Sequence, residues 1–175
     1  MTVSAKPSVI RFTLNAARSG PAYVLSPRTQ TVWTWRSRSQ PTATVPQAWY
    51  CSYVLVNGQY VARRRCAVQP MMTLDYQVRG LALDGTAPAG PQAIDLTVGH
   101  LQLARAARVT GAAAQVSCDG GQRWQRATVT ASGRGLFRIG FRVPGGCGVT
   151  LRVSATDAAG GSVTETITRA YAVAG

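Results

Sequence analysis

Few residues of this chain could carry acid–base or nucleophilic chemistry. His100 is the single histidine, Glu165 is the single glutamate, and the aspartates fall mostly in predicted turns or on solvent faces. A serine peptidase needs Ser, His and Asp in three separate motifs, and a glycosidase needs a pair of carboxyl groups that flank one bond. Neither set can be assembled from these residues, so the sequence predicts a non-catalytic protein without a cofactor.

Two aspartates are the candidates for holding a metal ion. Asp119 and Asp157 each stand at the start of a glycine-containing turn. If both turns lie at the same end of a sandwich, the two carboxylates could meet and bind calcium weakly. No further oxygen-rich loop accompanies them. We therefore predict no metal site, with this calcium pair as the open alternative.

The cysteines are better suited to disulfides than to metal or redox chemistry. Cys51, Cys66, Cys118 and Cys147 are even in number, and none lies in a CxxC spacing. Cys118 and Cys147 fall on inward-facing positions of two different predicted strands, which a disulfide between sandwich layers requires. We predict the bonds Cys51–Cys66 and Cys118–Cys147.

The segment that joins the first two cysteines predicts a β-hairpin with two competing registers. A turn at Asn57-Gly58 sets Cys51 opposite Arg64 and leaves Cys66 on the diagonal, about 7–8 Å away. A turn at Gly58-Gln59 sets Cys51 opposite Cys66, with Cα atoms about 5.5 Å apart, which a disulfide can bridge. We therefore predict the second register, or a bulge of equal effect.

A strand with aromatic and basic residues is the candidate binding surface. Trp33 and Trp35 share one face of a predicted strand, and Arg36 and Arg38 follow closely. Two tryptophans on one face indicate a core layer. In the alternative, they form an exposed platform, and these four residues contact an anionic glycan or cell-wall polymer.

The chain is strongly basic, with a formal net charge of +13, and Lys6 is its only lysine. Such a charge gives nonspecific affinity for polyanions. Only residues 63–65 form a basic run, however, and no nucleic-acid-binding motif accompanies the other arginines. We expect scattered, solvated charge and no specific nucleic-acid partner.

Alternating strands without helical periodicity predict an all-β fold. Residues 147–155 alternate between apolar and polar side chains, and residues 162–173 return after a turn. The return strand carries Glu165 and Arg169 on its inner parity, so we expect it at a sheet edge or with a bulge.

The turn-rich residues 84–92 predict a boundary between two consecutive β-sandwich-like units. Residues 1–88 would form an N-terminal β-rich domain that contains the Cys51–Cys66 hairpin. Residues 89–175 would form an immunoglobulin/fibronectin-III-like sandwich.

Four segments carry a resemblance to a known family. They are residues 25–37 (LSPRTQTVWTWRS), 69–100, 116–129 (VSCDGGQRWQRATV) and 149–171. In this order they resemble the C-terminal accessory region of large secreted subtilisin-like serine peptidases from GC-rich bacteria. The resemblance implies β-rich domains that follow a protease domain, with an extracellular and non-catalytic role. The cysteine hairpin looks like an insertion relative to that family.

Two functional hypotheses follow. In the first, the chain is an accessory or structural module that stabilises or orients a subtilisin-like protease domain, in cis or in trans, or its substrate. In the second, it is an extracellular module that binds an anionic glycan or cell-wall polymer. No apolar run approaches the roughly 20 residues that span a bilayer. The paired cysteines lead us to expect a secreted piece, with a leader and upstream region preceding Met1.

Overall fold

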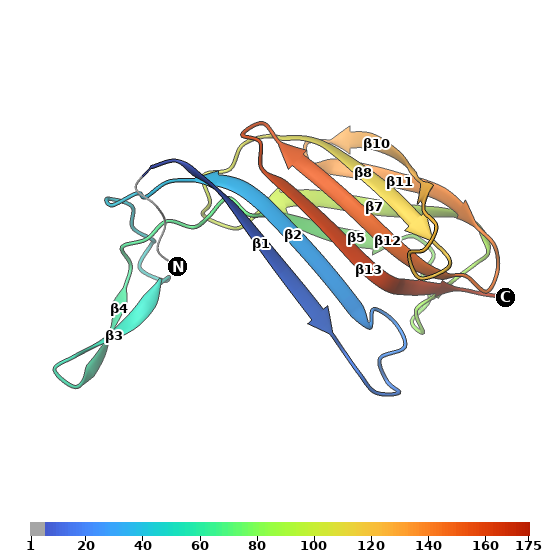
Figure 1. Cartoon of the computed structure of the whole chain (residues 1–175), viewed down its shortest axis with the longest axis horizontal. Helices are drawn as coiled ribbons and strands as arrows, with labels where there is room; N and C mark the ends of the chain where they lie inside the picture. The colour runs from blue at the N-terminus through green and yellow to red at the C-terminus, as the bar shows by residue number, and fades with distance from the viewer. Residues whose placement is uncertain (1–5) are drawn as a thin grey trace.

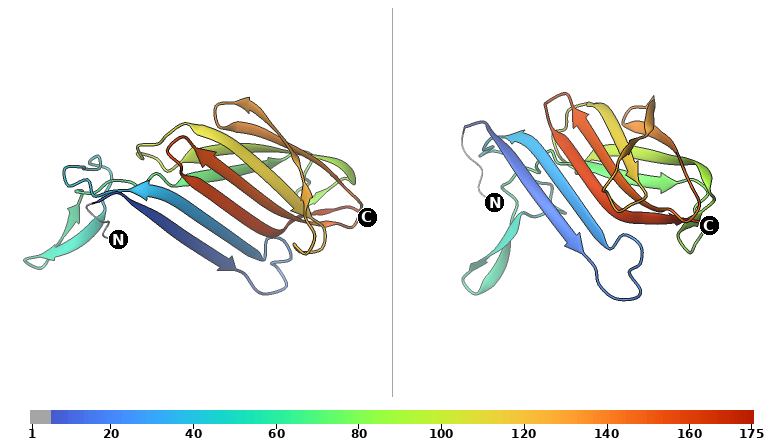
Figure 2. Two further views of the ribbon diagram at one scale, coloured as in Figure 1. Left: turned by 45° about the horizontal axis from the view of Figure 1, so that its top comes forward. Right: turned by 45° about the vertical axis from the view of Figure 1, so that its right-hand side comes forward.

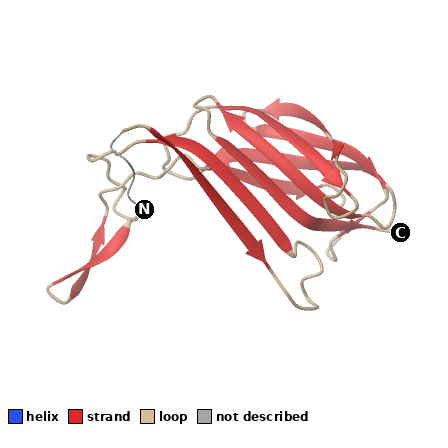
Figure 3. Ribbon diagram, viewed as in Figure 1, coloured by secondary structure: helices blue, strands red, loops and turns tan. Residues whose placement is uncertain are grey.

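The computed structural model describes residues 6–175, and every regular element in them is a β-strand. Two sheets pack face to face as a sandwich, and a small hairpin projects beyond one end of it (Figure 1, Figure 3). No described residue is helical. The predicted all-β fold is confirmed, and Met1 lies outside the described residues.

The larger sheet has seven strands and the smaller sheet has four. In spatial order, the larger sheet contains β1 (Ser8–Ala17), β2 (Arg28–Ser37), β13 (Ser162–Val173), β12 (Gly148–Asp157), β8 (Val109–Ser117) and β9 (Gln125–Arg126), with β6 (Thr86–Ala87) parallel to the end of β13. The smaller sheet contains β10 (Thr128–Gly133), β11 (Leu136–Val143), β7 (Gly90–His100) and β5 (Met72–Val78). The projecting hairpin consists of β3 (Ser52–Val56) and β4 (Gln59–Arg63).

The core lies between the two sheets, where the alternation of each strand turns its apolar side chains inward. Ile94 of β7 and Ile139 of β11 face Val149 and Val153 of β12, and all four are fully buried. Burial of this kind contributes about 1.5–3 kcal/mol for each large aliphatic side chain. The sandwich therefore has a sizeable core of its own, independent of the hairpin.

The predicted division into residues 1–88 and 89–175 needs correction, because strands from both parts share both sheets. β5 pairs with β7 from Met72 opposite His100 onwards. β2 pairs with β13, with Thr34 opposite Ser162. The Gly- and Pro-rich segment 84–92 marks a reversal of the chain between strands of one sandwich. Turn residues reveal where a chain turns, and they do not reveal which strands it will pair with.

The return strand β13 carries the predicted bulge and is not at an edge. It pairs with β12 on one side and with β2 on the other. The register with β12 shifts between Val149 and Leu151. At the bulge Arg169 adopts a φ of 51°, and its backbone N–H donates to Oγ1 of the buried Thr150, at 3.1 Å. The bulge moves the Arg169 side chain from the inner parity to solvent.

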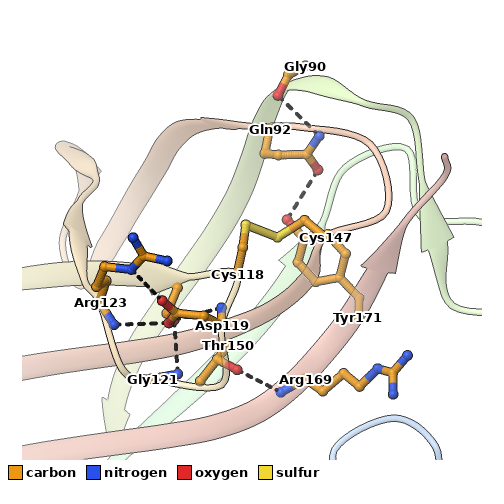
Figure 4. Close-up of a disulfide and its surroundings, with 11 residues drawn as sticks. Gly90, Gln92, Cys118, Asp119, Gly121, Arg123, Cys147, Thr150, Arg169 and Tyr171 are labelled. Atoms are coloured by element: carbon orange, nitrogen blue, oxygen red, sulfur yellow. Dashed lines mark hydrogen bonds and ion pairs between the residues drawn. A yellow bond between two sulfur atoms is a disulfide. The ribbon is translucent and has the colours of Figure 1, made fainter.

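Both predicted disulfides are present. Cys118 and Cys147 join the loop after β8 to the residue before β12, with Cα atoms 5.1 Å apart (Figure 4). Nearby, the Tyr171 hydroxyl of β13 donates to Oε1 of Gln92 on β7, at 3.1 Å. The predicted placement of this disulfide between the layers is wrong, because Cys118 is exposed just after β8 and the bond joins neighbouring strands of the larger sheet. The Tyr171–Gln92 hydrogen bond is the contact that crosses to the smaller sheet. Together they fasten the end of the sandwich opposite the hairpin.

The hairpin register differs from the predicted one. Val56 pairs with Gln59, so the two-residue turn is Asn57-Gly58, and both residues have positive φ angles. The ladder ends at Ser52 opposite Arg63. Beyond it the chain bends, with the Cys66 N–H bonded to the Arg64 carbonyl oxygen, and this brings the Cα of Cys66 within 6.1 Å of that of Cys51. The bend therefore brings the two cysteines within disulfide distance, which the sequence led us to expect from a shifted register or a bulge.

The two disulfides should differ in what they stabilise. We expect Cys118→Ala with Cys147→Ala to lower the free energy of unfolding by about 2–4 kcal/mol, because that bond closes a loop within the sandwich. Cys51→Ala with Cys66→Ala should change the main transition by only about 0.5 kcal/mol, because the hairpin lies outside the core. Urea unfolding followed by tryptophan fluorescence measures both. Complete loss of β circular dichroism in the first variant would show that the core does not suffice.

Candidate functional site

A cleft of about 740 Å³ lies where the sandwich meets the base of the hairpin. Four segments form it: Pro7 just before β1, the end of β2 with the loop that follows, the loop between β4 and β5, and the loop between β7 and β8. These segments gather at the end of the sandwich from which the hairpin projects (Figure 2). A second hollow of about 440 Å³ adjoins it and shares Arg38, Gln40, Thr42, Ala43 and Arg105 with it.

Backbone hydrogen bonds hold the loops of the cleft in place. The Val45 N–H donates to the Arg64 carbonyl oxygen at 2.9 Å, which ties the loop after β2 to the hairpin. The Leu101 N–H donates to the Met71 carbonyl oxygen at 2.9 Å, and the Ala158 N–H donates to the Arg108 carbonyl oxygen at 2.9 Å. The second and third bonds fix the two ends of the loop between β7 and β8. The cleft is therefore built on anchored loops.

The charged side chains that line the cleft are all basic. Arg36 comes from β2, Arg38 from the loop after it and Arg105 from the loop between β7 and β8, and all three are exposed. In the part of the chain that the structure describes, no acidic residue lines the cleft or the adjoining hollow. Within residues 6–175 none of the three arginines forms an ion pair. Apolar side chains such as Val45, Pro46, Val68, Pro70 and Leu103 make up much of the remaining wall.

The predicted binding surface divides between the inside and the outside of the sandwich. Trp35 is 4% exposed, and its indole N–H donates to Oε1 of Gln69 at 2.9 Å. Trp33 packs against the core and donates to the Met72 carbonyl oxygen at 2.8 Å. The core interpretation of the tryptophans is therefore confirmed.

The same alternation that buries Trp35 places Arg36 on the outer face of β2. Arg36 and Arg38 lie at the cleft as a pair, and Arg105 is the residue that the sequence interpretation missed. Arg105 lies in a loop far along the chain. Its basic character was visible in the sequence, but its proximity to β2 depends on the fold.

His100 forms a buried hydrogen-bonding contact at this end of the sandwich. Its Nε2 lies 3.0 Å from Oδ2 of Asp157, and the two side chains are 8% and 2% exposed. Oδ1 of Asp157 also accepts hydrogen bonds from the backbone N–H groups of Ala159 and Gly161. His100 ends β7 and Asp157 ends β12, so the contact joins the two sheets. It also fixes the start of the loop that carries Arg105.

The two aspartates considered for calcium lie at opposite ends of β8 and cannot share an ion. Asp157 pairs with Val109 at the start of β8, and Asp119 follows the end of that strand. Hydrogen bonds from Ser117 and from the backbone and side chain of Arg123 lower the pKa of Asp119 (Figure 4). Within the described part of the chain, no group of acidic, histidine or cysteine side chains could hold a metal ion.

A third polar cluster lies between the sheets. Oγ1 of Thr31 on β2 donates to Oε2 of Glu165 on β13, at 2.7 Å. Tyr76 of β5 faces them from the smaller sheet, and its buried hydroxyl lies close to the Glu165 carboxylate. Burial, followed by the neighbouring carboxylate of Glu165, raises the pKa of Tyr76 well above its ordinary value. This cluster joins β2 and β13 of the larger sheet to β5 of the smaller one.

A scan against models of protein families and a search of curated proteins found no match for this chain. In the described residues, no helix has the length and apolar character needed to cross a membrane.

The Tyr76 hydroxyl should make stability depend on alkaline pH. Because the pKa of Tyr76 is higher in the folded state, its contribution is present below the ordinary pKa of 10.0 and is lost progressively above it. We expect Tyr76→Phe to reduce the fall in unfolding free energy above that pH.

Chemical denaturation across neutral and alkaline pH tests this expectation. Tyr60→Phe on the exposed hairpin is the matched control and should leave the profile unchanged. An equally steep fall of the unfolding free energy in the Tyr76→Phe variant and in the unmodified chain would contradict the expectation.

Proposed function

We propose that this chain is a non-catalytic extracellular module that binds an anionic polymer, such as an acidic glycan or a cell-wall polymer. The observation that carries the proposal is the cleft lined by Arg36, Arg38 and Arg105 without any acidic residue. The two disulfides are consistent with an extracellular protein.

Arginine suits such a site because its planar guanidinium donates two parallel hydrogen bonds to a carboxylate, sulfate or phosphate group. Elsewhere in the described chain, several arginines already form ion pairs with acidic residues. Asp95 pairs with Arg79 and Arg138, and Asp119 pairs with Arg123. Among residues 6–175 the cleft arginines have no acidic partner, and they stay available to an external anion. The anchored loops reduce the conformational entropy that binding would cost.

The cleft also accounts for the position of the first disulfide. Cys66 lines the cleft, and its bond to Cys51 fixes the base of the hairpin. This bond contributes little to the sandwich core. It holds one wall of the cleft relative to the loop that carries Arg38.

Neutralising the cleft arginines should weaken polymer binding far more than removing the same charge elsewhere. We expect Arg36→Gln, Arg38→Gln and Arg105→Gln together to reduce the affinity for heparin and for isolated cell walls by roughly tenfold or more. The matched control replaces Arg63, Arg64 and Arg65, which are exposed on and beside the hairpin. Both triple variants lose three positive charges. Fluorescence anisotropy at several salt concentrations compares them.

The control triple variant should retain nearly the affinity of the unmodified chain. Equal loss in both variants would contradict the proposal, because binding would then follow net charge alone. Circular dichroism establishes that each variant is folded.

A second candidate function is that of an accessory module of a secreted subtilisin-like peptidase, as the resemblance over residues 22–171 suggests. The projecting hairpin favours it. Tyr53, Leu55 and Tyr60 lie on one face of that hairpin with exposures of 53%, 64% and 77%. A protruding apolar arm of this kind fits against a neighbouring domain.

The accessory role predicts a subtilisin-like protease domain encoded in frame upstream of residue 1. When the two are expressed as one chain, Tyr53→Ser with Tyr60→Ser should separate a single calorimetric transition into two. Cys51 and Cys66 are unchanged in this variant, so the hairpin stays closed. An unrelated upstream sequence would count against the accessory role and leave polymer binding untouched.

A further inference from the structure

The outer edge of β1 has no partner in the described chain. All ten residues of β1, Ser8–Ala17, pair with β2 on one side. On the other side β1 ends the larger sheet, and no other described strand approaches it (Figure 1). β1 contains no proline, and Arg11 is its only charged residue. Edge strands of monomeric proteins are usually shorter, or are blocked by charges, prolines or bulges.

The inner face of β1 is uncovered as well. Ile10, Phe12 and Leu14 share the inward parity with Trp33, and Phe12 stacks on Trp33 with ring centroids 5.7 Å apart. The smaller sheet ends at β5 and leaves Phe12 46% and Leu14 49% exposed. An open backbone edge and an exposed apolar row therefore coincide on one strand.

We propose that β1 pairs antiparallel with β1 of a second copy of this chain, about a two-fold axis at Phe12. In that register Phe12 lies opposite Phe12 of the second copy, and Ile10 lies opposite Leu14. Arg11 lies opposite Thr13, and Val9 lies opposite Asn15. The apolar row is self-complementary, which an isologous interface requires.

Neighbouring two-fold registers are less favourable. An axis at Arg11 sets the two arginines directly opposite each other, and like charges in that position destabilise a strand pair. An axis at Thr13 sets Ile10 opposite Ala16 and loses an apolar contact. The apolar row reads the same in both directions about Phe12, and a second copy supplies the identical row in reverse. The pattern of β1 therefore favours a second copy as the occupant.

The positive charge of the chain predicts how the affinity of the dimer changes with salt concentration. In the Phe12 register the two Arg11 side chains are diagonal neighbours on the outer face, about 7–8 Å apart. Two copies of formal charge +13 also repel each other at longer range. Salt screens both effects, so dimerisation should strengthen as salt is added. Polyanion binding in the cleft should weaken under the same change, so the two properties can be measured separately.

Cross-linking of single cysteine variants tests the register. The four native cysteines are paired, so Phe12→Cys introduces an unpaired thiol that meets its own copy at the two-fold axis. Val9→Cys is the matched control, because Val9 is 64% exposed on the same strand but lies opposite Asn15. We expect Phe12→Cys to form a disulfide-linked dimer under mild oxidation and Val9→Cys to form little. Peptide mapping confirms which cysteines are joined.

Sedimentation of the unmodified chain over a range of concentrations tests the dimer itself. We expect reversible dimerisation, weakened roughly tenfold or more by Phe12→Lys, which sets two charges opposite each other. The melting temperature of Phe12→Lys shows whether its fold is intact. A monomer at every concentration, equal cross-linking of both cysteine variants, or a Phe12→Lys dimer of unchanged affinity would each overturn the proposal.

Discussion

Both edges of β13 are paired, and the rest of the molecule depends on that double pairing. On one side β13 pairs with β12, the strand that precedes it in the chain. On the other side it accepts β2, with Thr31 opposite Glu165 across a sequence separation of 134 residues. Through β2 it also holds β1. The N-terminal strands thus extend a sheet whose centre is built by the C-terminal ones, and the cleft forms where the loops of the two parts meet.

Alternation in the sequence predicted most strands and the faces of both tryptophans, because parity determines which side chains face inward. Both disulfide pairings were also predicted correctly, but the register expected for Cys51–Cys66 and the inward position expected for Cys118 were wrong. It could not predict that β2 and β13 are neighbours. Many strands rich in Val and Thr could pair with one another in a sheet. The alternation of side chains does not determine which of these pairs forms. The hairpin turn shows a different limit. Asn57-Gly58 follows its local preference for a tight turn, and the chain bends at Cys66 to reach Cys51 beyond the ladder.

The candidate cleft arises from the same alternation as the core. Trp35 points inward to Gln69, so its neighbour Arg36 points outward to the cleft. Arg105 joins it through the loop that begins at His100, whose contact with Asp157 fixes that end of the sandwich. Residue types alone identified two of the three arginines. The third required knowledge of how the loop between β7 and β8 returns across the end of the sheets.

The polar cluster between the sheets explains why β2 adopts one register on β13. A slip by one residue would turn Thr31, Trp33 and Trp35 to the outer face together. The Glu165 carboxylate would then lose its hydrogen bond from Thr31 while still on the inner face, and an unpaired carboxylate there is costly. Slips by two residues keep the parity but move Thr31 away from Glu165. Burial of the tryptophans therefore excludes odd slips, and the Thr31–Glu165 bond excludes even ones. The position of Arg36 at the cleft follows from that single remaining register.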